Sequence, residues 1–467
     1  MAAASSAADA SACPPVRIAI VGAGLGGLTL ARMLHVSCAG HVVATVYESD
    51  ASEVSRDQGG TLDMHEKSGQ AALRAMGLWS AIAPHLRPEG EAMILCGADG
   101  IPVWEEREGK FIVGGPGPEG WAKPPADPDA PDTPATDSAT PGGADPGADA
   151  AATPAAGRPE VDRGVLRKVL LDSLPAGSVR WGAKVMAISA PASDSSSVRT
   201  LTLSSGERID ADLVVGADGA WSKVRSLVSS ALPAYTGITF VECQLAQIDQ
   251  RHPELAALVG PGLLIALAPD KGIFAQRVGT GSVRVYAAMR VPADWAASSG
   301  LDWTQPSSVR AHLLAQFAGF APPLRALLSS CDDLPRPVAR PLFGLPVDHS
   351  WPRDHSTRGV TLVGDAAHLM PPSGEGANLA MQDGMELALA LAAHPADIDA
   401  ALRVYESTLF PRSHESAADA QLMMDNTYAA NTPQSFIDAV FAPHFAATHA
   451  KQAADEQAAA AEGKKAQ

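Results

Sequence analysis

Short apolar runs that end next to glycine or an acid recur along the chain and indicate an α/β protein. Residues 16–21, 213–215 and 360–363 are rich in Val, Ile and Leu and show almost no polar alternation. Such runs are typical of parallel strands that are buried on both faces. Helical patterns over residues 28–35 and 379–393 follow the first and the last of them. We therefore expect a Rossmann-like, mostly parallel sheet covered by helices.

A different pattern occupies the middle of the chain. Residues 273–278 and 283–289 alternate between apolar and polar side chains, which is typical of antiparallel strands with one face on a core and the other solvated or lining a cavity. Helical patterns follow at residues 313–320 and 323–329, and again at 400–410 and 413–428. The resulting prediction is an α/β fold with an inserted α+β domain on a mixed or antiparallel sheet. Its parts are a Rossmann-like domain (15–80, 160–234 and 335–395), an inserted domain (81–113 and 235–334) and C-terminal helices (396–445).

One segment lacks the side chains that a folded core needs. Residues 124–157 contain no Ile, Leu, Val or Phe, carry six aspartates and have no Lys or Arg. A chain of this composition cannot bury enough apolar surface to offset its ordering entropy. We expect a disordered insertion over residues 114–159, and flexible tails at 1–14 and 446–467.

The first apolar run leads into a glycine-rich turn that suits a dinucleotide. Gly22, Gly24 and Gly27 have the spacing G-x-G-x-x-G between a strand and a helix, and Glu48 follows the next strand. In this arrangement the glycines allow a tight turn, a close approach to phosphate and helix packing, while the acid accepts ribose hydroxyls. The turn alone does not distinguish FAD from NAD. Its predicted cofactor-binding residues are Gly22, Ala23, Gly24, Leu25, Gly26, Gly27 and Glu48.

Two further turns and an arginine at the start of a helix are also candidate cofactor contacts. Asp218-Gly219 follows a buried strand and precedes an expected helix that opens with Ser222, although Asp-Gly is also an ordinary turn pair. Gly364-Asp365 ends another buried strand. Arg163 lies in the first turn of a helical pattern, where a cation opposes the helix dipole, so we expect it to reach a phosphate or a flavin.

These segments, in this order, resemble the three fingerprints of the single-component FAD-dependent aromatic hydroxylases. Within that family the chain looks most like the branch of the tetracycline-degrading monooxygenases, with which it shares residues 59–65 and 364–372. The resemblance implies FAD and NADPH as cofactors. It also implies that the Rossmann-like part is the FAD-binding domain and the inserted part the substrate-binding domain. It assigns the adenosine ribose to Glu48, the ribityl chain to Asp365, and other FAD contacts to Asp63 and Arg163. It associates Arg56 with NADPH, and Asp218-Gly219 with both cofactors.

The resemblance also implies the chemistry. NADPH would reduce the flavin, O₂ would add at C4a, and the flavin hydroperoxide would hydroxylate an electron-rich aromatic, phenolic or polyketide-like molecule. The cofactor performs the difficult step while the protein orients it and excludes water. Pro371 and Pro372 would face the flavin ring, and the helix that starts near Gly376, Ala377 and Asn378 would stabilise the reduced flavin's negative charge.

In the inserted domain we expect the substrate pocket to be lined by Phe274, Gln276, Arg284 and Tyr286, with Val278 and Val285 as further apolar wall. Leu263 and Arg284 lie near positions where tetracycline-degrading enzymes carry other residue types, so tetracycline is expected to be a poor substrate. Ser49 stands where close relatives often have an arginine. His65 and His368 are expected to be structural. For Glu375, a contact with cofactor or substrate and a role as a first-turn acid favoured by the helix dipole are equally open.

Other flavoenzymes on the same fold, such as a reductase or a halogenase, and a non-catalytic FAD-fold binding protein are the alternatives. No tryptophan lies in the Trp-x-Trp-x-Ile-Pro segment of halogenases. The formal charge of −17 without a basic stripe argues against nucleic-acid binding. Five scattered cysteines suggest a reducing compartment. No cluster has metal-ligand spacing, and no apolar stretch is long enough to span a membrane. We therefore expect a soluble, cytoplasmic monomer or homodimer, without a metal and without stable membrane insertion.

Overall fold

A parallel sheet forms the first half of the fold. The computed structural model describes residues 14–38, 40–55, 59–107, 110–112, 157–190 and 197–442, except for the side chains of residues 106–112. Within them, five strands pair in parallel, with Val21 beside Tyr47 on one side and Gly216 on the other. The carboxyl ends of the strands therefore meet at one edge. In spatial order the strands are β18 (Val360–Leu362), β12 (Leu213–Gly216), β1 (Val16–Val21), β2 (Val42–Tyr47) and β8 (Val179–Arg180).

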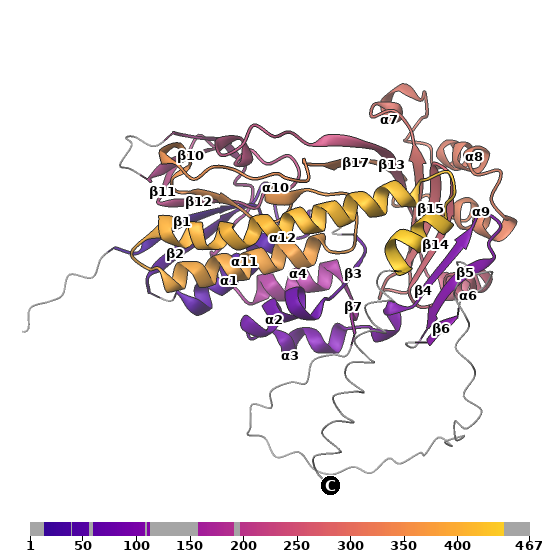
Figure 1. Cartoon of the computed structure of the whole chain (residues 1–467), viewed down its shortest axis with the longest axis horizontal. Helices are drawn as coiled ribbons and strands as arrows, with labels where there is room; N and C mark the ends of the chain where they lie inside the picture. The colour runs from indigo at the N-terminus through magenta and orange to yellow at the C-terminus, as the bar shows by residue number, and fades with distance from the viewer. Residues whose placement is uncertain are drawn as a thin grey trace, which may run out of the picture.

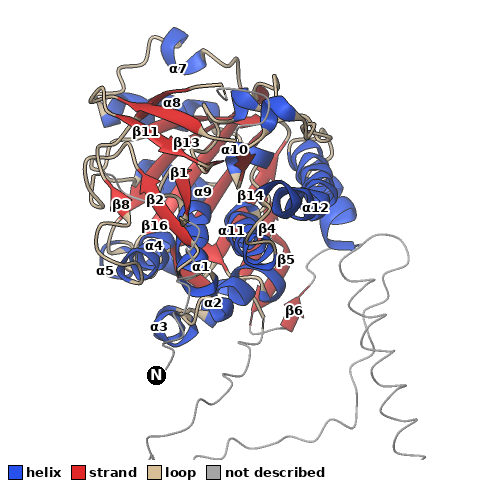
Figure 2. Cartoon of the chain, turned by 90° about the vertical axis from the view of Figure 1, so that its left-hand side faces the viewer, coloured by secondary structure: helices blue, strands red, loops and turns tan. Residues whose placement is uncertain are grey.

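Long helices lie beside one another next to this sheet. Figure 1 shows α12 (Ile398–Thr427), α11 (Gly376–Ala393) and α1 (Leu25–Ser37) running side by side, with α4 (Arg163–Asp172) below them, and Figure 2 shows the bundle end on. Two separate C-terminal helices were expected, and this was wrong, because α12 continues through Pro411. Leu409 and Ser413 are buried on either side of the proline. Their packing outweighs the single missing N–H that a proline costs a helix.

The helix expected to open at Ser222 is also absent. Only a short 3₁₀ turn, η4 (Arg225–Leu227), follows the Asp218 turn. The Asp218 carboxylate accepts the Lys223 N–H at 2.7 Å and the Ser222 hydroxyl at 2.5 Å, so it holds these groups in a local loop. Aspartate competes with helix formation in this way when its side chain takes nearby backbone amides.

The second half of the fold is a mixed eight-stranded sheet. Its strands, in spatial order, are β17 (Val338–Gly344), β13 (Ala234–Leu245), β16 (Val283–Arg290), β15 (Lys271–Arg277), β14 (Leu263–Ala268), β4 (Met93–Gly97), β5 (Pro102–Arg107) and β6 (Lys110–Ile112). Neighbours are antiparallel except for the parallel pair of β14 and β4. This mixed sheet, the parallel sheet and the C-terminal helices together confirm the predicted fold class.

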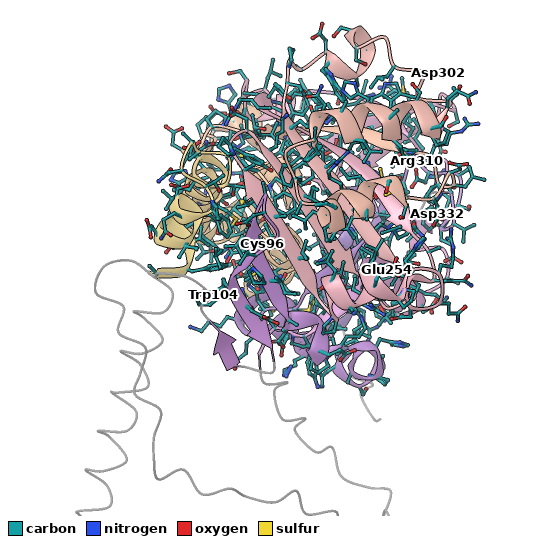
Figure 3. All side chains as sticks on the ribbon, turned by 90° about the vertical axis from the view of Figure 1, so that its right-hand side faces the viewer. Cys96, Trp104, Glu254, Asp302, Arg310 and Asp332 are labelled. Atoms are coloured by element: carbon teal, nitrogen blue, oxygen red, sulfur yellow. The ribbon has the colours of Figure 1, made fainter. Side chains whose placement is uncertain are left out.

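Helices cover one face of the mixed sheet. Alternate residues of β15 and β16, such as Ile273 and Val285, pack there against α6 (Pro253–Val259), α8 (Pro306–Gln316) and α9 (Pro322–Ser329). The first of the two helices expected after the strands thus begins earlier than predicted, at Pro306. Figure 3 looks onto this side. There, Arg310 of α8 donates to the carbonyl of Cys331 at 3.1 Å and so connects α8 with the segment directly after α9.

Two smaller sheets complete the fold. β9 (Val185–Ile188), β10 (Arg199–Leu203) and β11 (Arg208–Ala211) form an antiparallel sheet near the parallel one. β3 (Thr61–Asp63) and β7 (Glu160–Asp162) form a two-stranded ribbon. The Asp162 carboxylate accepts the Gly279 N–H at 2.8 Å, so this ribbon is bonded directly to the loop after β15 of the mixed sheet. The residues between β6 and Gly157, which hold most of the expected insertion, lie outside the described part of the chain.

Candidate cofactor and substrate site

The glycine turn after β1 brings three segments into close contact. Gly22 has a φ of 108°, and a Cβ there would lie 2.3 Å from the Ala217 carbonyl oxygen. A Cβ on Gly27 would lie 2.2 Å from the Gly22 carbonyl oxygen. Gly24 differs, because a Cβ there would meet no atom within 4 Å. Its open side lies at the N-terminus of α1, so the turn has room for a pyrophosphate beside helix amides.

Glu48 directly follows β2 and is bonded to the same turn. Its carboxylate is only 4% exposed and accepts the N–H groups of Ala23 at 2.7 Å and Asp50 at 2.9 Å. The Ser49 hydroxyl also donates to it at 2.9 Å. The predicted ribose acid therefore lies beside the glycine turn and helps to shape it, while its contact with a ribose stays a prediction.

An arginine that was not predicted supports the turn from α4. The Arg167 side chain is buried and donates to the Ala23 carbonyl at 3.2 Å and the Glu53 carbonyl at 3.0 Å. It lies one helical turn after the half-buried Arg163, whose N–H donates to the Gly60 carbonyl at 3.1 Å. The pair of arginines at this spacing was the signal that could have identified Arg167. Arg56 lies outside the described residues.

Asp63, at the end of β3, meets the N-terminus of α11. Its carbonyl accepts the Asn378 side-chain amide at 2.7 Å, and the Asn378 oxygen accepts the His65 N–H at 3.0 Å. The Asp63 carboxylate lies 2.8 Å from His65 Nε2, and the other ring nitrogen lies 4.0 Å from Glu375. The structure thus brings Asp63 together with the start of α11, where Gly376, Ala377 and Asn378 lie.

The acid after β18 is positioned by a buried ionic network. Gly364 has a φ of 59°, and its N–H donates to Asp383 of α11 at 2.8 Å. The same carboxylate lies 2.6 Å from His368 Nε2 and 2.7 Å from an Arg412 nitrogen of α12. Burial alone would lower the pKa of His368, but Asp383 outweighs it and raises that pKa above its usual value. Asp365 itself is exposed, so its carboxylate is accessible next to this rigid turn.

Arg225 connects the Asp218 turn with the Asp365 turn. Its buried guanidinium donates to the Ala220 carbonyl at 2.6 Å and to the Ala366 carbonyl at 3.2 Å. Burial raises the pKa of Asp218, against the lowering effect of its hydrogen bonds from Ser222 and Lys223. The two predicted acid turns are therefore joined by one cation, a role that the sequence did not indicate for Arg225.

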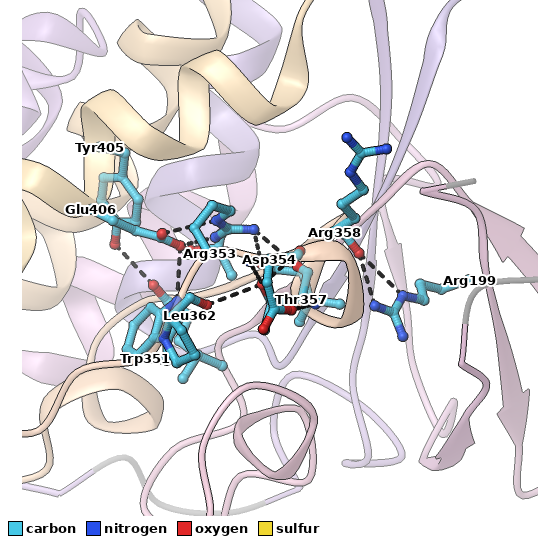
Figure 4. Close-up of polar contacts among 12 residues, drawn as sticks. Arg199, Trp351, Arg353, Asp354, Thr357, Arg358, Leu362, Tyr405 and Glu406 are labelled. Atoms are coloured by element: carbon cyan, nitrogen blue, oxygen red, sulfur yellow. Dashed lines mark hydrogen bonds and ion pairs between the residues drawn. The ribbon is translucent and has the colours of Figure 1, made fainter. Parts of the chain in front are cut away.

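A second network holds β18 against α12, as Figure 4 shows. The buried Glu406 carboxylate pairs with Arg353 and accepts the Trp351 ring N–H at 2.9 Å and the Thr361 hydroxyl at 2.8 Å. Tyr405 donates to the Leu362 carbonyl at 2.9 Å. Since β18 ends directly before the Gly364-Asp365 turn, these contacts fix the strand that carries the predicted ribityl ligand.

The four predicted substrate residues share one face of the mixed sheet. Phe274 lies opposite Tyr286, and Gln276 lies opposite Arg284. All four side chains are half-buried. A Cβ on Gly60 would lie 3.3 Å from the Gln276 amide oxygen and 3.5 Å from the Tyr286 hydroxyl. This face of the sheet therefore meets the loop that leads into Asp63.

Two features of this face were not predicted. Glu242 on β13 is buried and pairs with Arg284 at 2.9 Å and with Arg340 of β17. Arg284 is therefore already held by a carboxylate. Val285, expected to be part of the pocket wall, packs in the core on the opposite face with Ile273, because successive residues of a strand point to opposite sides.

Comparisons with known proteins show the family of this chain. A family model for the FAD binding domain matches residues 15–323 and 345–414. The chain belongs to this family. Its similarity to FAD-dependent monooxygenases confirms the single-component FAD-dependent monooxygenase family predicted from the sequence, with FAD as the cofactor of the fold. No helix among the described residues is long and apolar enough to cross a membrane.

Two relatives and one solved structure illustrate the similarity. Monooxygenase penA of Penicillium thymicola is 35% identical over 269 residues, which cover 50% of this chain and 62% of that protein. Monooxygenase asqM of Emericella nidulans is 31% identical over 323 residues, covering 56% and 71%. The chain thus spans less than two thirds of the first relative. The structure of Klebsiella pneumoniae HpxO complexed with FAD and uric acid has a TM-score of 0.65 at 20% identity, covers 90% of both chains and shows a shared fold.

Proposed function

We propose that this protein is a monooxygenase that uses FAD, NADPH and O₂ to hydroxylate an electron-rich aromatic, phenolic or polyketide-like small molecule. Family membership supports the FAD-dependent monooxygenase class. One structural observation carries the rest: the face of the mixed sheet with Gln276 and Tyr286 meets Gly60, in the loop that leads into the predicted flavin contact Asp63. A molecule on that face would lie next to the cofactor segments.

Bound FAD supplies the redox chemistry, accepting a hydride from the nicotinamide and activating O₂. The residues of the chain bind and orient it. The open glycine turn at Gly24 receives the pyrophosphate, with Arg167 and Glu48 holding the turn in shape. The exposed Asp365 carboxylate accepts hydroxyls of the ribityl chain. Asn378, bonded to Asp63 and His65, fixes the start of α11, whose amides stabilise negative charge on the reduced cofactor.

The substrate face combines apolar rings with a few polar groups, which is usual for small-molecule sites. Phe240 stacks on Phe274 with ring centroids 5.6 Å apart and lies 5.8 Å from the Tyr286 ring. These rings suit a planar substrate. Gln276 offers an amide and Tyr286 a hydroxyl to a phenolic or carbonyl oxygen. Glu242 pairs with both Arg284 and Arg340, so two guanidinium groups lie near this face, and cations of this kind favour an anionic or phenolate group nearby.

The test is a compound screen with the purified protein. NADPH oxidation is followed for each compound, and products are analysed by mass spectrometry for one added oxygen atom. We expect slow oxidation without a compound and acceleration with a planar, electron-rich aromatic. A flavin-loaded protein that neither NADPH nor NADH reduces, with any compound, would show that the proposed function is wrong.

Asp365→Ala tests the cofactor part of the proposal. The substitution removes charge-assisted hydrogen bonds, so FAD affinity should fall by roughly 1.5–3 kcal/mol, which is about 10- to 150-fold in the dissociation constant. FAD retention after dialysis and fluorescence titration of the apoprotein measure this. Glu415→Ala, an exposed acid on α12, is the matched control and should bind FAD as the unchanged protein does. Stoichiometric FAD in dialysed Asp365→Ala would contradict the assigned role.

A further inference from the structure

A hollow of about 460 Å³ lies between the two acid turns and the edge of the mixed sheet. Its walls are residues 220–221 after the Asp218 turn, residues 341–343 of β17, and Leu369, Met370 and Pro372 after the Asp365 turn. None of these residues is among the predicted substrate contacts, and only Pro372 was expected near the flavin. The hollow therefore differs from the predicted substrate face and adjoins the proposed cofactor site.

The walls of this hollow are held at fixed positions. Arg225 bonds the Ala220 carbonyl on one side and the Ala366 carbonyl on the other, at 2.6 and 3.2 Å. The Leu345 N–H, directly after β17, donates to the Leu369 carbonyl at 2.8 Å. The three walls are thus bonded to one another, so the hollow exists before any ligand binds. Preformed hollows with apolar walls are the usual form of small-molecule sites.

Trp221 gives the hollow an aromatic surface. Its side chain is 64% exposed, which is high for the largest apolar side chain. The indole packs edge-on against Phe343 with centroids 5.0 Å apart and an interplanar angle of 71°, and Phe343 in turn lies 5.7 Å from Tyr235. This support fixes the orientation of the indole while leaving most of it open to a planar ligand.

The open position of the hollow distinguishes its ligand from the substrate. Oxygen transfer requires a site from which water is excluded, and the half-buried face around Phe274 and Tyr286 meets that need better. A dinucleotide electron donor has a different requirement. It inserts only its ring, donates electrons and leaves again, so its site must be accessible from solvent. The hollow offers this access, and its wall at Leu369–Met370–Pro372 continues directly from Asp365.

We propose that this hollow binds the nicotinamide ring of the electron donor, stacked on Trp221. The inference rests on the proposed function and adds the place from which the donor acts. In the step, a C–H bond of the dihydronicotinamide breaks, and the hydride with its electron pair passes to oxidised FAD, which also takes up a proton. The donor ring leaves as a cation. Trp221 suits both forms, since an indole face stacks on a neutral ring and attracts a cationic one.

The experiment compares Trp221→Ala with Trp221→Phe in the FAD-loaded protein. The matched control is Val404→Ala, because Val404 is an exposed apolar residue of α12. Binding of NADP⁺ is measured by calorimetry and by magnetisation transfer from the protein to the nicotinamide protons. Anaerobic rapid mixing with NADPH gives the dissociation constant and the rate of flavin reduction. We expect Trp221→Ala to weaken NADP⁺ and NADPH binding about tenfold and to lose the ring-proton signal. Trp221→Phe should keep most of the affinity, and Val404→Ala should match the unchanged protein.

Other outcomes would overturn the inference. Unchanged NADP⁺ binding and unchanged ring signals in Trp221→Ala would place the nicotinamide elsewhere. A rise in substrate KM alone would make the hollow part of the substrate site, and loss of FAD would make it part of the flavin site. FAD content and reduction by dithionite are therefore measured for every variant. If neither nicotinamide reduces the unchanged protein, the proposed function itself fails, a result that is distinct from a failure confined to the Trp221 variants.

Discussion

Glu160 is a buried acid whose environment strongly alters its chemistry. It lies on β7, is 7% exposed, and has one carboxylate oxygen without a hydrogen-bond partner. Burial raises its pKa to about 7, opposed by a hydrogen bond with Thr61 and by Arg87, and assisted by the nearby Asp63 and Asp162. This carboxyl group therefore changes its charge near neutral pH at the junction between the ribbon and the mixed sheet.

The raised pKa makes a prediction about stability. The folded protein holds this proton up to a pH of about 7, whereas the unfolded chain releases it near 4.5. The free energy of unfolding therefore falls by up to about 3 kcal/mol as pH rises from about 4.5 to 7, and this loss levels off above that range. Glu160→Gln keeps the shape without the titration. The free energies of unfolding of the variant and the unchanged protein are measured with urea at pH 5 and pH 8. The variant should be more stable, relative to the unchanged protein, at pH 8 than at pH 5. An equal difference at both values would contradict this prediction.

At the scale of residues, the sequence predicted the positions that have a motif and missed those that act through a distant partner. Glycine spacing and acids at strand ends predicted the turns at Gly22 and at Gly364-Asp365, because such turns require those residue types locally. Arg225, Asp383 and Glu242 carry no such local signal. Their partners in these contacts lie 15 to 141 positions away, so only folding brings them together.

Among the elements, α12 has a central role because it carries charged groups into both networks behind the Asp365 turn. Arg412 reaches Asp383, and Glu406 accepts bonds from Trp351 and Thr361. Glu406 and its partner Arg353 are both largely removed from solvent. The helix is therefore part of the support for the cofactor turn, although it contributes none of the predicted cofactor contacts.

Removing one partner of this buried pair should cost much more than removing both. Arg353→Met leaves the buried Glu406 carboxylate without its cation, which typically costs about 3–5 kcal/mol. Arg353→Met combined with Glu406→Gln should recover part of that loss, because no buried charge remains. Thermal and urea unfolding of the FAD-loaded variants measure the difference. A double variant that is as unstable as the sum of both single variants would show that the two side chains do not act as a pair.

Prediction of elements succeeded where periodicity was strong and failed where a side chain changed the local outcome. The alternation over residues 273–278 and 283–289 predicted β15 and β16, whereas the register that puts Phe274 opposite Tyr286 is seen only in the structure. Pro411 suggested a break in a helix that packing against α11 keeps intact. Ser222 suggested a helix start that the Asp218 carboxylate prevents by binding the following amides.

At the scale of the whole molecule, the β3–β7 ribbon connects the parallel sheet with the mixed sheet. Arg87 donates to the Thr61 hydroxyl of β3 at 3.0 Å and lies 3.6 Å from the Asp162 carboxylate of β7, which is bonded to Gly279 of the mixed sheet. The presence of two domains could be predicted from a change of periodicity. Their mutual placement could not, because it depends on these contacts between residues distant in sequence.

The substrate face predicts which molecules are accepted. Leu263 of β14 lies opposite Gln276 of β15, and Arg284 pairs with Glu242. Neither position carries the residue type expected there in tetracycline-degrading enzymes. We expect tetracycline to give no more than slow turnover, compared with a planar aromatic compound found in the screen. NADPH oxidation and product mass, measured for both at equal concentration, decide this. Efficient hydroxylation of tetracycline would show that the substrate assignment is wrong although the family is right.

The central claim is that this protein transfers one atom of O₂ to an organic substrate at the expense of NADPH. The most direct measurement is turnover of a screened aromatic substrate under isotopically labelled O₂ in ordinary water, followed by mass spectrometry of the product. A monooxygenase incorporates a single labelled oxygen atom per product and consumes NADPH in step with it. Product whose new oxygen comes from water, or NADPH consumption that yields only hydrogen peroxide with every compound, would contradict the claim.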